Sequence, residues 1–119
     1  MSHPLLRIEQ REERGVSVIE AHGELDLSTA PELAARLDAA RRHGVAPRVV
    51  VDLTDLEFCD STGLRALLGA ATEVRRAGGR LVVVPGAGAV LRLLSITGAE
   101  EWLDIQSDAA RALAALSRR

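Results

Sequence analysis

The order of apolar and polar positions predicts alternating strands and helices around one central stretch. Three consecutive valines at positions 49–51 predict a strand that is covered on both faces. After a loop over residues 54–59, apolar residues recur at spacings of three and four from Leu64 to Val74, which predicts an amphipathic helix. Asp60 or Ser61 is its expected N-cap, because a side-chain oxygen there accepts hydrogen bonds from the free amides of the first turn. The central stretch is therefore a buried strand that leads into a capped helix.

The segments before this stretch predict a hairpin and a helix. Residues 5–12 and 16–22 predict two antiparallel strands joined by a turn at 13–15, and the more polar first strand is expected at a sheet edge. Thr29 is the expected N-cap of a helix that ends near Gly44, with Glu32 completing a capping box. Residues 47–52 then form the expected third strand.

The segments after it continue the alternation. The central helix is expected to run to about Ala77, and residues 80–85 predict a second buried strand. A short helix closed by Gly98, a short edge strand over 102–105 and a last helix capped by Ser107 over 108–116 follow. The pattern predicts an α/β fold: one domain over residues 1–119 with a mixed four- to five-stranded sheet, about four helices, and tails at 1–4 and 117–119.

Composition narrows the possible functions. A formal net charge of −2 and only two aromatic residues, Phe58 and Trp102, argue against a nucleic-acid partner. All 15 basic residues are arginines and there is no tyrosine, which excludes a Schiff-base lysine, a P-loop lysine and a tyrosine acid. No apolar run approaches the ~18 residues of a membrane span, so none is expected. A single cysteine, Cys59, favours the reducing cytoplasm.

The hydroxyl pair Ser61 and Thr62 at the start of the central helix is the main candidate for chemistry. The helix dipole and free amides there favour negative charge. Gly63 costs up to ~1 kcal/mol relative to Ala in a helix, and it is expected to leave the backbone beside the hydroxyls uncovered. From the residues alone, a functional site and a plain helix cap both stay open.

Two other kinds of site have weaker support. A serine hydrolase would need His22 as the base for Ser61, but Asp-Ser-Thr-Gly differs from the Gly-x-Ser-x-Gly nucleophile elbow. His3, His22, His43 and Cys59 show no metal-ligand spacing. No metal site and no cofactor are therefore expected.

Four blocks of the sequence resemble the STAS-domain family of anti-sigma factor antagonists. The first is Gly23-Glu24-Leu25-Asp26, and the longest runs over residues 51–64 through Phe58-Cys59-Asp60-Ser61-Thr62-Gly63. The strand at 79–84 and the helix end at 93–98 are also similar. Together the blocks extend over essentially the whole chain, and their combination is specific.

The resemblance implies a non-enzymatic partner switch. The unphosphorylated form would bind an anti-sigma factor that is also a serine kinase, which frees a sigma factor. Phosphorylation of Ser61 with ATP would end binding, and a metal-dependent serine phosphatase would restore it. Thr62 would be a secondary acceptor. The implied partner-binding residues are Glu24, Asp26, Asp60, Ser61, Thr62, Gly63 and Arg65.

Two points leave an alternative open. Arg65 stands where many family members have glycine, so its role is not given by the resemblance. Some STAS domains are scaffolds or transporter-associated modules that bind constitutively. In that case Ser61 would be only a helix cap.

Overall fold

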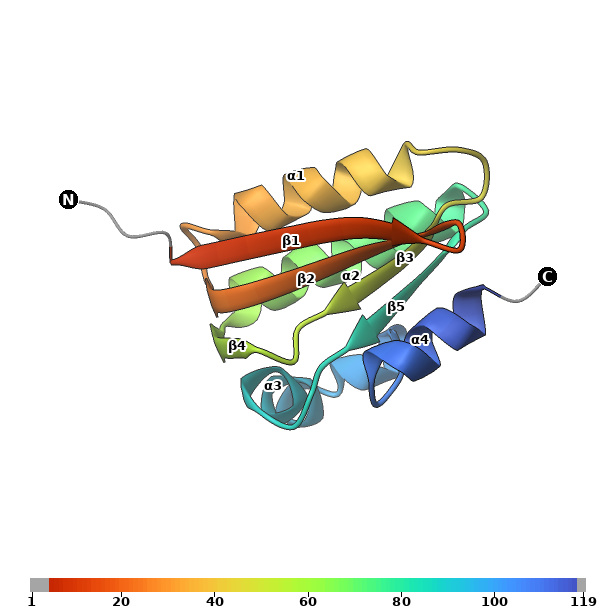
Figure 1. Ribbon diagram of the computed structural model, residues 1–119. Helices are drawn as coiled ribbons and strands as arrows, with labels where there is room; N and C mark the ends of the chain where they lie inside the picture. The colour runs from red at the N-terminus through yellow and green to blue at the C-terminus, as the bar shows by residue number, and fades with distance from the viewer. Residues whose placement is uncertain (1–4, 118–119) are drawn as a thin grey trace.

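A mixed β-sheet with helices on both faces forms the computed structural model, which describes residues 5–117 (Figure 1). Residues 1–4 and 118–119 of the predicted tails lie outside the described residues, whereas Ser117, which was expected to belong to the C-terminal tail at 117–119, is the C-cap of the last helix. In chain order the elements are β1 (Leu6–Glu13), β2 (Val16–Leu25), α1 (Ala30–Arg41), β3 (Arg48–Asp52), β4 (Leu56–Cys59), α2 (Ser61–Arg76), β5 (Arg80–Val84), α3 (Ala89–Thr97), the 3-10 helix η1 (Ala99–Trp102), β6 (Asp104–Ile105) and α4 (Ala109–Leu116).

The predicted hairpin and parallel strands are confirmed. Strands β1 and β2 are antiparallel, with Glu13 paired to Val16 across a turn at Arg14 and Gly15. Both turn residues have positive φ, 56° and 77°, as a two-residue hairpin with the right-handed strand twist requires. Strands β2, β3, β5 and β6 are parallel, in an order that places β1 at an edge.

Strand β4 was not predicted, and it raises the sheet to six strands from the expected four to five. Residues 54–59 were expected to be a loop, but β4 pairs in parallel with the second half of β2, Glu24 opposite Phe58 and Leu25 opposite Cys59. Its two middle residues, Glu57 and Phe58, are both exposed, so the four-residue strand lacks an alternating pattern.

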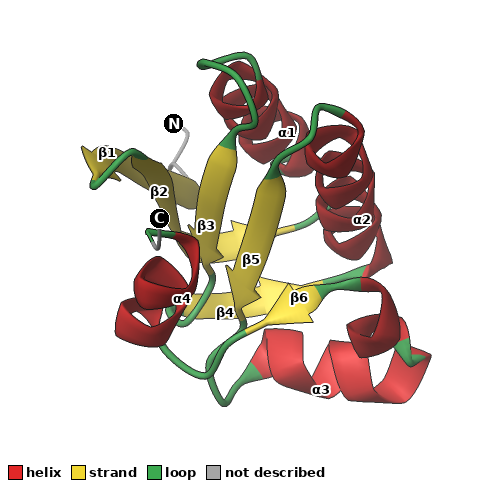
Figure 2. Cartoon of the chain, turned by 90° about the vertical axis from the view of Figure 1, so that its right-hand side faces the viewer, coloured by secondary structure: helices red, strands yellow, loops and turns green. Residues whose placement is uncertain are grey.

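The helices form two layers about the sheet (Figure 2). Helices α1 and α2 cover one face, where Leu33, Leu37 and Leu67 pack on Val49 and Val51. Helix α4 covers part of the other face, where Ala112 and Leu116 pack on alternate valines, among them Val50. The three successive valines therefore reach both cores, as predicted for a strand covered on both faces.

Three details at element ends differ from the prediction. The Thr29 hydroxyl does not cap α1 but accepts from the Asp26 amide at 2.9 Å and donates to the Glu24 carbonyl at 2.8 Å, so no capping box forms. Asp108 caps α4 in place of Ser107, because its carboxylate accepts from the Arg111 amide at 2.8 Å. Trp102 belongs to η1, which leaves β6 with only two residues.

Candidate functional site

Asp60, one of the two predicted N-cap candidates, is the N-cap of α2. It has extended backbone, and its Oδ1 accepts hydrogen bonds from the amides of Thr62 at 3.0 Å and Gly63 at 3.1 Å. Its own amide donates to the Leu25 carbonyl at 3.2 Å, which fixes the start of the helix to the end of β2. A cap of this kind contributes about 1 kcal/mol to stability. The side chains of Ser61 and Thr62 are therefore not needed for capping.

Ser61 projects from the first turn of α2 into solvent. Its side chain is exposed, and its hydroxyl has no hydrogen-bond partner within residues 5–117. Thr62 is half-buried. An unengaged hydroxyl at a helix N-terminus is chemically accessible to a kinase, and a phosphate there lies where the helix dipole favours negative charge. The assignment of Ser61 as phosphoacceptor stays a prediction.

Strand pairing brings the first predicted block beside the second. Glu24 and Leu25 on β2 are the register partners of Phe58 and Cys59 on β4, directly before Asp60. This pairing explains why residues 34 positions apart in the sequence contribute to one site. The Glu24 side chain is half-buried at this junction.

The Asp26 side chain forms its hydrogen bonds within the loop between β2 and α1. Its Oδ1 accepts from the Ser28 hydroxyl at 2.8 Å, the Ser28 amide at 2.9 Å and the Thr29 amide at 3.1 Å. These bonds, led by the one from the Ser28 hydroxyl, lower the pKa of Asp26 below its ordinary value. The geometry favours a loop-shaping role for Asp26 over direct partner contact.

The sequence predicted that Gly63 would leave the backbone beside the hydroxyls uncovered. This prediction is wrong, because Gly63 lies buried against β2. A Cβ at this position would lie 2.7 Å from Leu25 Cγ, 2.8 Å from Leu25 Cδ2 and 3.3 Å from Cys59 Sγ. Leu25 is fully buried, so the close approach to α2 is fixed by the core. Gly63 thus sets the position of the first helical turn instead of opening a docking space.

Arg65 lies one turn beyond Ser61 on α2 and is exposed. Within residues 5–117 no carboxylate forms an ion pair with its guanidinium. It is the basic side chain in the first two turns of α2, whose other basic residues lie in the last turn. Arg65 is therefore available to a phosphate or to an acidic partner.

Two exposed apolar side chains extend from the segments that meet at the start of α2. Phe58 on β4 is 47% exposed, and Leu27, in the loop after β2, is 75% exposed. Sequence reasoning singled out Phe58 but missed Leu27, because a strand pattern would place position 27 on the same side as the buried Leu25, whereas β2 ends at Leu25 and Leu27 lies in the loop. Apolar side chains around a polar centre are typical of protein interfaces.

The neighbours of Ser61 do not supply a catalytic base. His22 has its charged contacts with Glu9, Glu20 and Asp55, and none of its contacts within the described chain is with Ser61. Burial, reinforced by the charge of Asp60, raises the pKa of the Cys59 thiol to about 11, so it is neutral near pH 7. The Ser61–His22 pair that a serine hydrolase would need is not formed.

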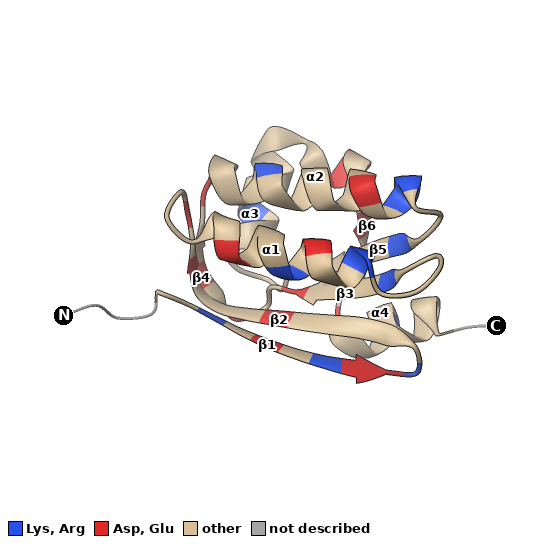
Figure 3. Cartoon of the chain, turned by 90° about the horizontal axis from the view of Figure 1, so that it is seen from above, with Lys and Arg blue, Asp and Glu red and all other residues tan. Residues whose placement is uncertain are grey.

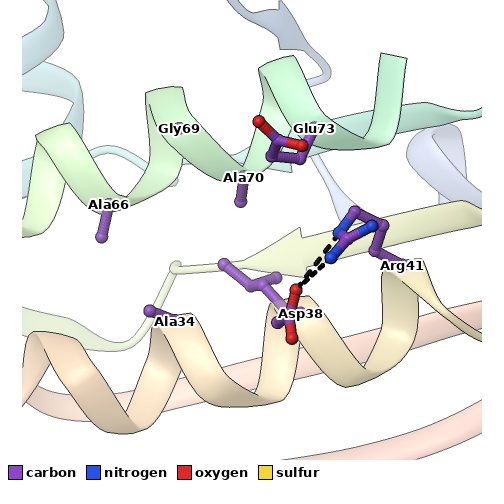
Figure 4. Close-up of a pocket in the computed structure, with 8 residues that line it drawn as sticks. Ala34, Asp38, Arg41, Ala66, Gly69, Ala70 and Glu73 are labelled. Carbon is purple, nitrogen blue, oxygen red and sulfur yellow. Dashed lines mark hydrogen bonds and ion pairs between the residues drawn. The ribbon is translucent and has the colours of Figure 1, made fainter. Parts of the chain in front are cut away.

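A groove of about 360 Å³ lies between α1 and α2, away from these residues (Figure 4). The small residues Ala66, Gly69 and Ala70 of α2 form one wall. On the α1 side Arg41 donates to Asp38 at 3.2 Å through Nε. None of the predicted site residues lines this groove.

Comparison with known proteins identifies the family. The STAS domain model matches residues 7–112. The anti-sigma F factor antagonist of Paenibacillus polymyxa is 32% identical over 111 residues, which cover 93% of this chain and 95% of that protein. The anti-sigma-B factor antagonist of Listeria monocytogenes is 30% identical over 103 residues, covering 86% and 88%.

A solved structure has the same fold over almost all of this chain. It is an anti-sigma factor antagonist from Mycobacterium paratuberculosis, with a TM-score of 0.85, 29% identity, and coverage of 99% of this chain and 100% of that one. Its fold and the match over residues 7–112 agree with the resemblance carried by the sequence blocks. This chain belongs to the STAS domain family.

Proposed function

We propose that this protein is an anti-sigma factor antagonist controlled by phosphorylation of Ser61. In its unphosphorylated form it binds an anti-sigma factor with serine kinase activity, and the sigma factor held by that anti-sigma factor is released. The observation that carries the proposal is the exposed Ser61 hydroxyl, which does not take part in capping because Asp60 caps α2. Relatives named as anti-sigma factor antagonists support the class of partner.

The electrostatics of this turn account for a switch without refolding. Phosphorylation adds about −1.5 to −2 charge at neutral pH. The N-terminus of α2 and the unpaired Arg65 would stabilise that charge by up to ~2 kcal/mol, whereas the carboxylate of Asp60 opposes it. The domain therefore tolerates the phosphate, but a docked partner that buries it would lose several kcal/mol.

The remaining steps belong to partners and not to this chain. The kinase supplies the phosphoryl group from ATP, and a metal-dependent serine phosphatase removes it to restore binding. The neutral Cys59 thiol, and the contacts of His22 with Asp55, Glu9 and Glu20 instead of Ser61, support a non-enzymatic role. Because its partners act on sigma factors of RNA polymerase, we place the protein in the cytoplasm. In residues 5–117 no helix has the length and apolar character needed to cross a membrane.

Displacement of a sigma factor tests this function directly. The unphosphorylated chain is added to a preformed complex of the sigma factor and anti-sigma kinase from the same organism, without ATP. We expect release of the sigma factor, measured by size-exclusion chromatography or fluorescence anisotropy of labelled sigma factor. Preincubation with kinase and ATP should abolish release by the wild type but not by Ser61→Ala.

The same assay distinguishes an antagonist controlled by phosphorylation from a scaffold that binds constitutively. A chain that never displaces the sigma factor contradicts the proposed function. A chain that displaces it equally well before and after incubation with ATP contradicts control through Ser61. Ser107→Ala, which removes an exposed hydroxyl next to α4 and away from the start of α2, is the matched control and should respond to ATP as the wild type does.

A further inference from the structure

Three metal-ligating side chains converge on the face of the β1–β2 hairpin opposite α1 and α2. Glu9 on β1 is the direct register partner of Glu20 on β2, and His22 lies two residues beyond Glu20. Residues two apart in a strand point to the same side, so these three share one face. His22 Nε2 lies 3.9 Å from Glu9 Oε1 and 3.8 Å from Glu20 Oε1. One ligand atom from each residue lies within 4.8 Å of the others.

The imidazole of His22 is oriented from its other side. Its Nδ1 lies 3.3 Å from Asp55 Oδ2, in the turn before β4, so the carboxylate favours a proton on Nδ1. That tautomer leaves a lone pair on Nε2, which is excluded from solvent and has no hydrogen-bond partner within the described chain. Three acceptor atoms therefore face one another without a donor. A carboxylate behind the second nitrogen is the usual arrangement of a metal-bound histidine.

Acidic and basic residues alternate along β1 (Figure 3), and the ion pairs around the cluster leave it with a net negative charge. Arg7 pairs with Glu9 Oε2, and Arg11 pairs with Glu20 Oε2 at 2.7 Å, so each glutamate still directs Oε1 toward His22. Arg11 also pairs with Glu13 at 3.1 Å. Two guanidinium groups thus face four carboxylates, those of Glu9, Glu13, Glu20 and Asp55, which leaves two negative charges uncompensated with His22 neutral.

We propose that His22, Glu9 and Glu20 bind one zinc ion, with Asp55 as the positioning residue behind His22. Two ligands of a tetrahedral zinc ion at ordinary bond lengths lie ~3.4 Å apart, so the observed 3.8 Å and 3.9 Å need only a small contraction. An imidazole with two carboxylates is a ligand set that zinc accepts, and water completes the fourth position. The ion ties β1, β2 and the turn before β4 together.

The sequence did not predict this site, because it contains no ligand motif of short spacing. Glu9 is eleven residues from Glu20, and only the hairpin register places them opposite each other. A proton on Nε2 is the competing way to satisfy the same atoms, because an imidazolium would pair with both glutamates. The two accounts differ in whether the cluster takes up metal near neutral pH.

Zinc titration of the full, untagged chain after chelator treatment tests the proposal. We expect one zinc ion per chain by isothermal titration calorimetry, and a change of the His22 Nε2 resonance in nitrogen-detected NMR. His22→Gln should abolish binding, and Asp55→Asn should weaken it about tenfold through loss of orientation. Glu9→Gln, at a half-exposed position, should also weaken binding and does not depend on His22→Gln folding.

The matched control is His43→Gln. His43 Nε2 lies 2.9 Å from Glu12, but within residues 5–117 that pair has a single carboxylate and no third ligand, so the loss of His43 should leave zinc affinity unchanged. Absence of stoichiometric zinc binding to the wild type overturns the proposal in favour of a proton on Nε2. Full zinc affinity in both His22→Gln and Glu9→Gln overturns it as well, because the metal then binds elsewhere.

Discussion

Ser61→Asp is expected to weaken binding to the anti-sigma factor by about a hundredfold relative to the wild type, which corresponds to about 2.7 kcal/mol. The exposed side chain at the first turn of α2 would bring a fixed negative charge into the docked interface, beside the charge of Asp60. A buried charge without a partner costs several kcal/mol, and the helix dipole and Arg65 recover only part of that. Calorimetry or surface plasmon resonance without ATP measures the loss.

Two control variants test whether the loss of affinity comes from the negative charge at position 61. One keeps the size of the aspartate without its charge, and the other places the same charge elsewhere on the surface. Ser61→Asn has nearly the same size as Ser61→Asp but is neutral, so it should keep most of the affinity. Ser107→Asp places the same charge at an exposed position beside α4, on the opposite face of the sheet, and should bind as the wild type does. Equal affinities for Ser61→Asp and Ser61→Asn would contradict electrostatic control and favour a constitutive STAS scaffold.

Gly63→Ala and Gly69→Ala are expected to change stability in opposite directions. The two glycines lie on the same helix, but a Cβ at position 63 would lie 2.7 Å from Leu25 Cγ, whereas one at position 69 meets nothing within 4 Å. Overpacking costs about 1–3 kcal/mol, and replacing a helical glycine by alanine returns about 1 kcal/mol. Gly63→Ala should therefore lower the free energy of unfolding by about 1–2 kcal/mol, and Gly69→Ala should raise it by up to about 1 kcal/mol.

Urea unfolding followed by circular dichroism measures both variants. Parallel transitions with unchanged slope are required for the comparison. A Gly63→Ala protein as stable as Gly69→Ala would contradict a tight contact between α2 and Leu25. Gly63→Ala should lower the free energy of unfolding by less in a Leu25→Ala background than in the wild type, because the smaller side chain at position 25 removes the clash.

Much of the fold could be predicted because local patterns carried it. The apolar stripe after Asp60 predicted α2, and the successive valines predicted β3 with two covered faces. Arg14-Gly15 indicated the hairpin turn. Asp60 was predictable as a cap because capping depends on residues one to three positions away. The resemblance then identified the STAS family, which the comparisons confirm.

The errors arose where distant parts of the chain decide the structure. Strand β4 exists because β2 continues far enough to pair with it, and its own four residues carry no alternation. Gly63 was misread because Leu25, the side chain that fills the space beside it, is thirty-eight residues away in the sequence. The Thr29 hydroxyl bonds to the backbone of Glu24, at the end of β2, and of Asp26, in the loop after it, which a capping-box pattern does not anticipate.

The position of the phosphate is the most direct test of control through Ser61. The full chain is incubated to completion with the anti-sigma kinase and ATP, then digested and mapped by tandem mass spectrometry. We predict one phosphate per chain on Ser61, none in Ser61→Ala beyond a minor fraction on Thr62, and no binding of the phosphorylated chain to the kinase. A phosphate on another residue, or a Ser61-phosphorylated chain that still binds with full affinity, would contradict the account.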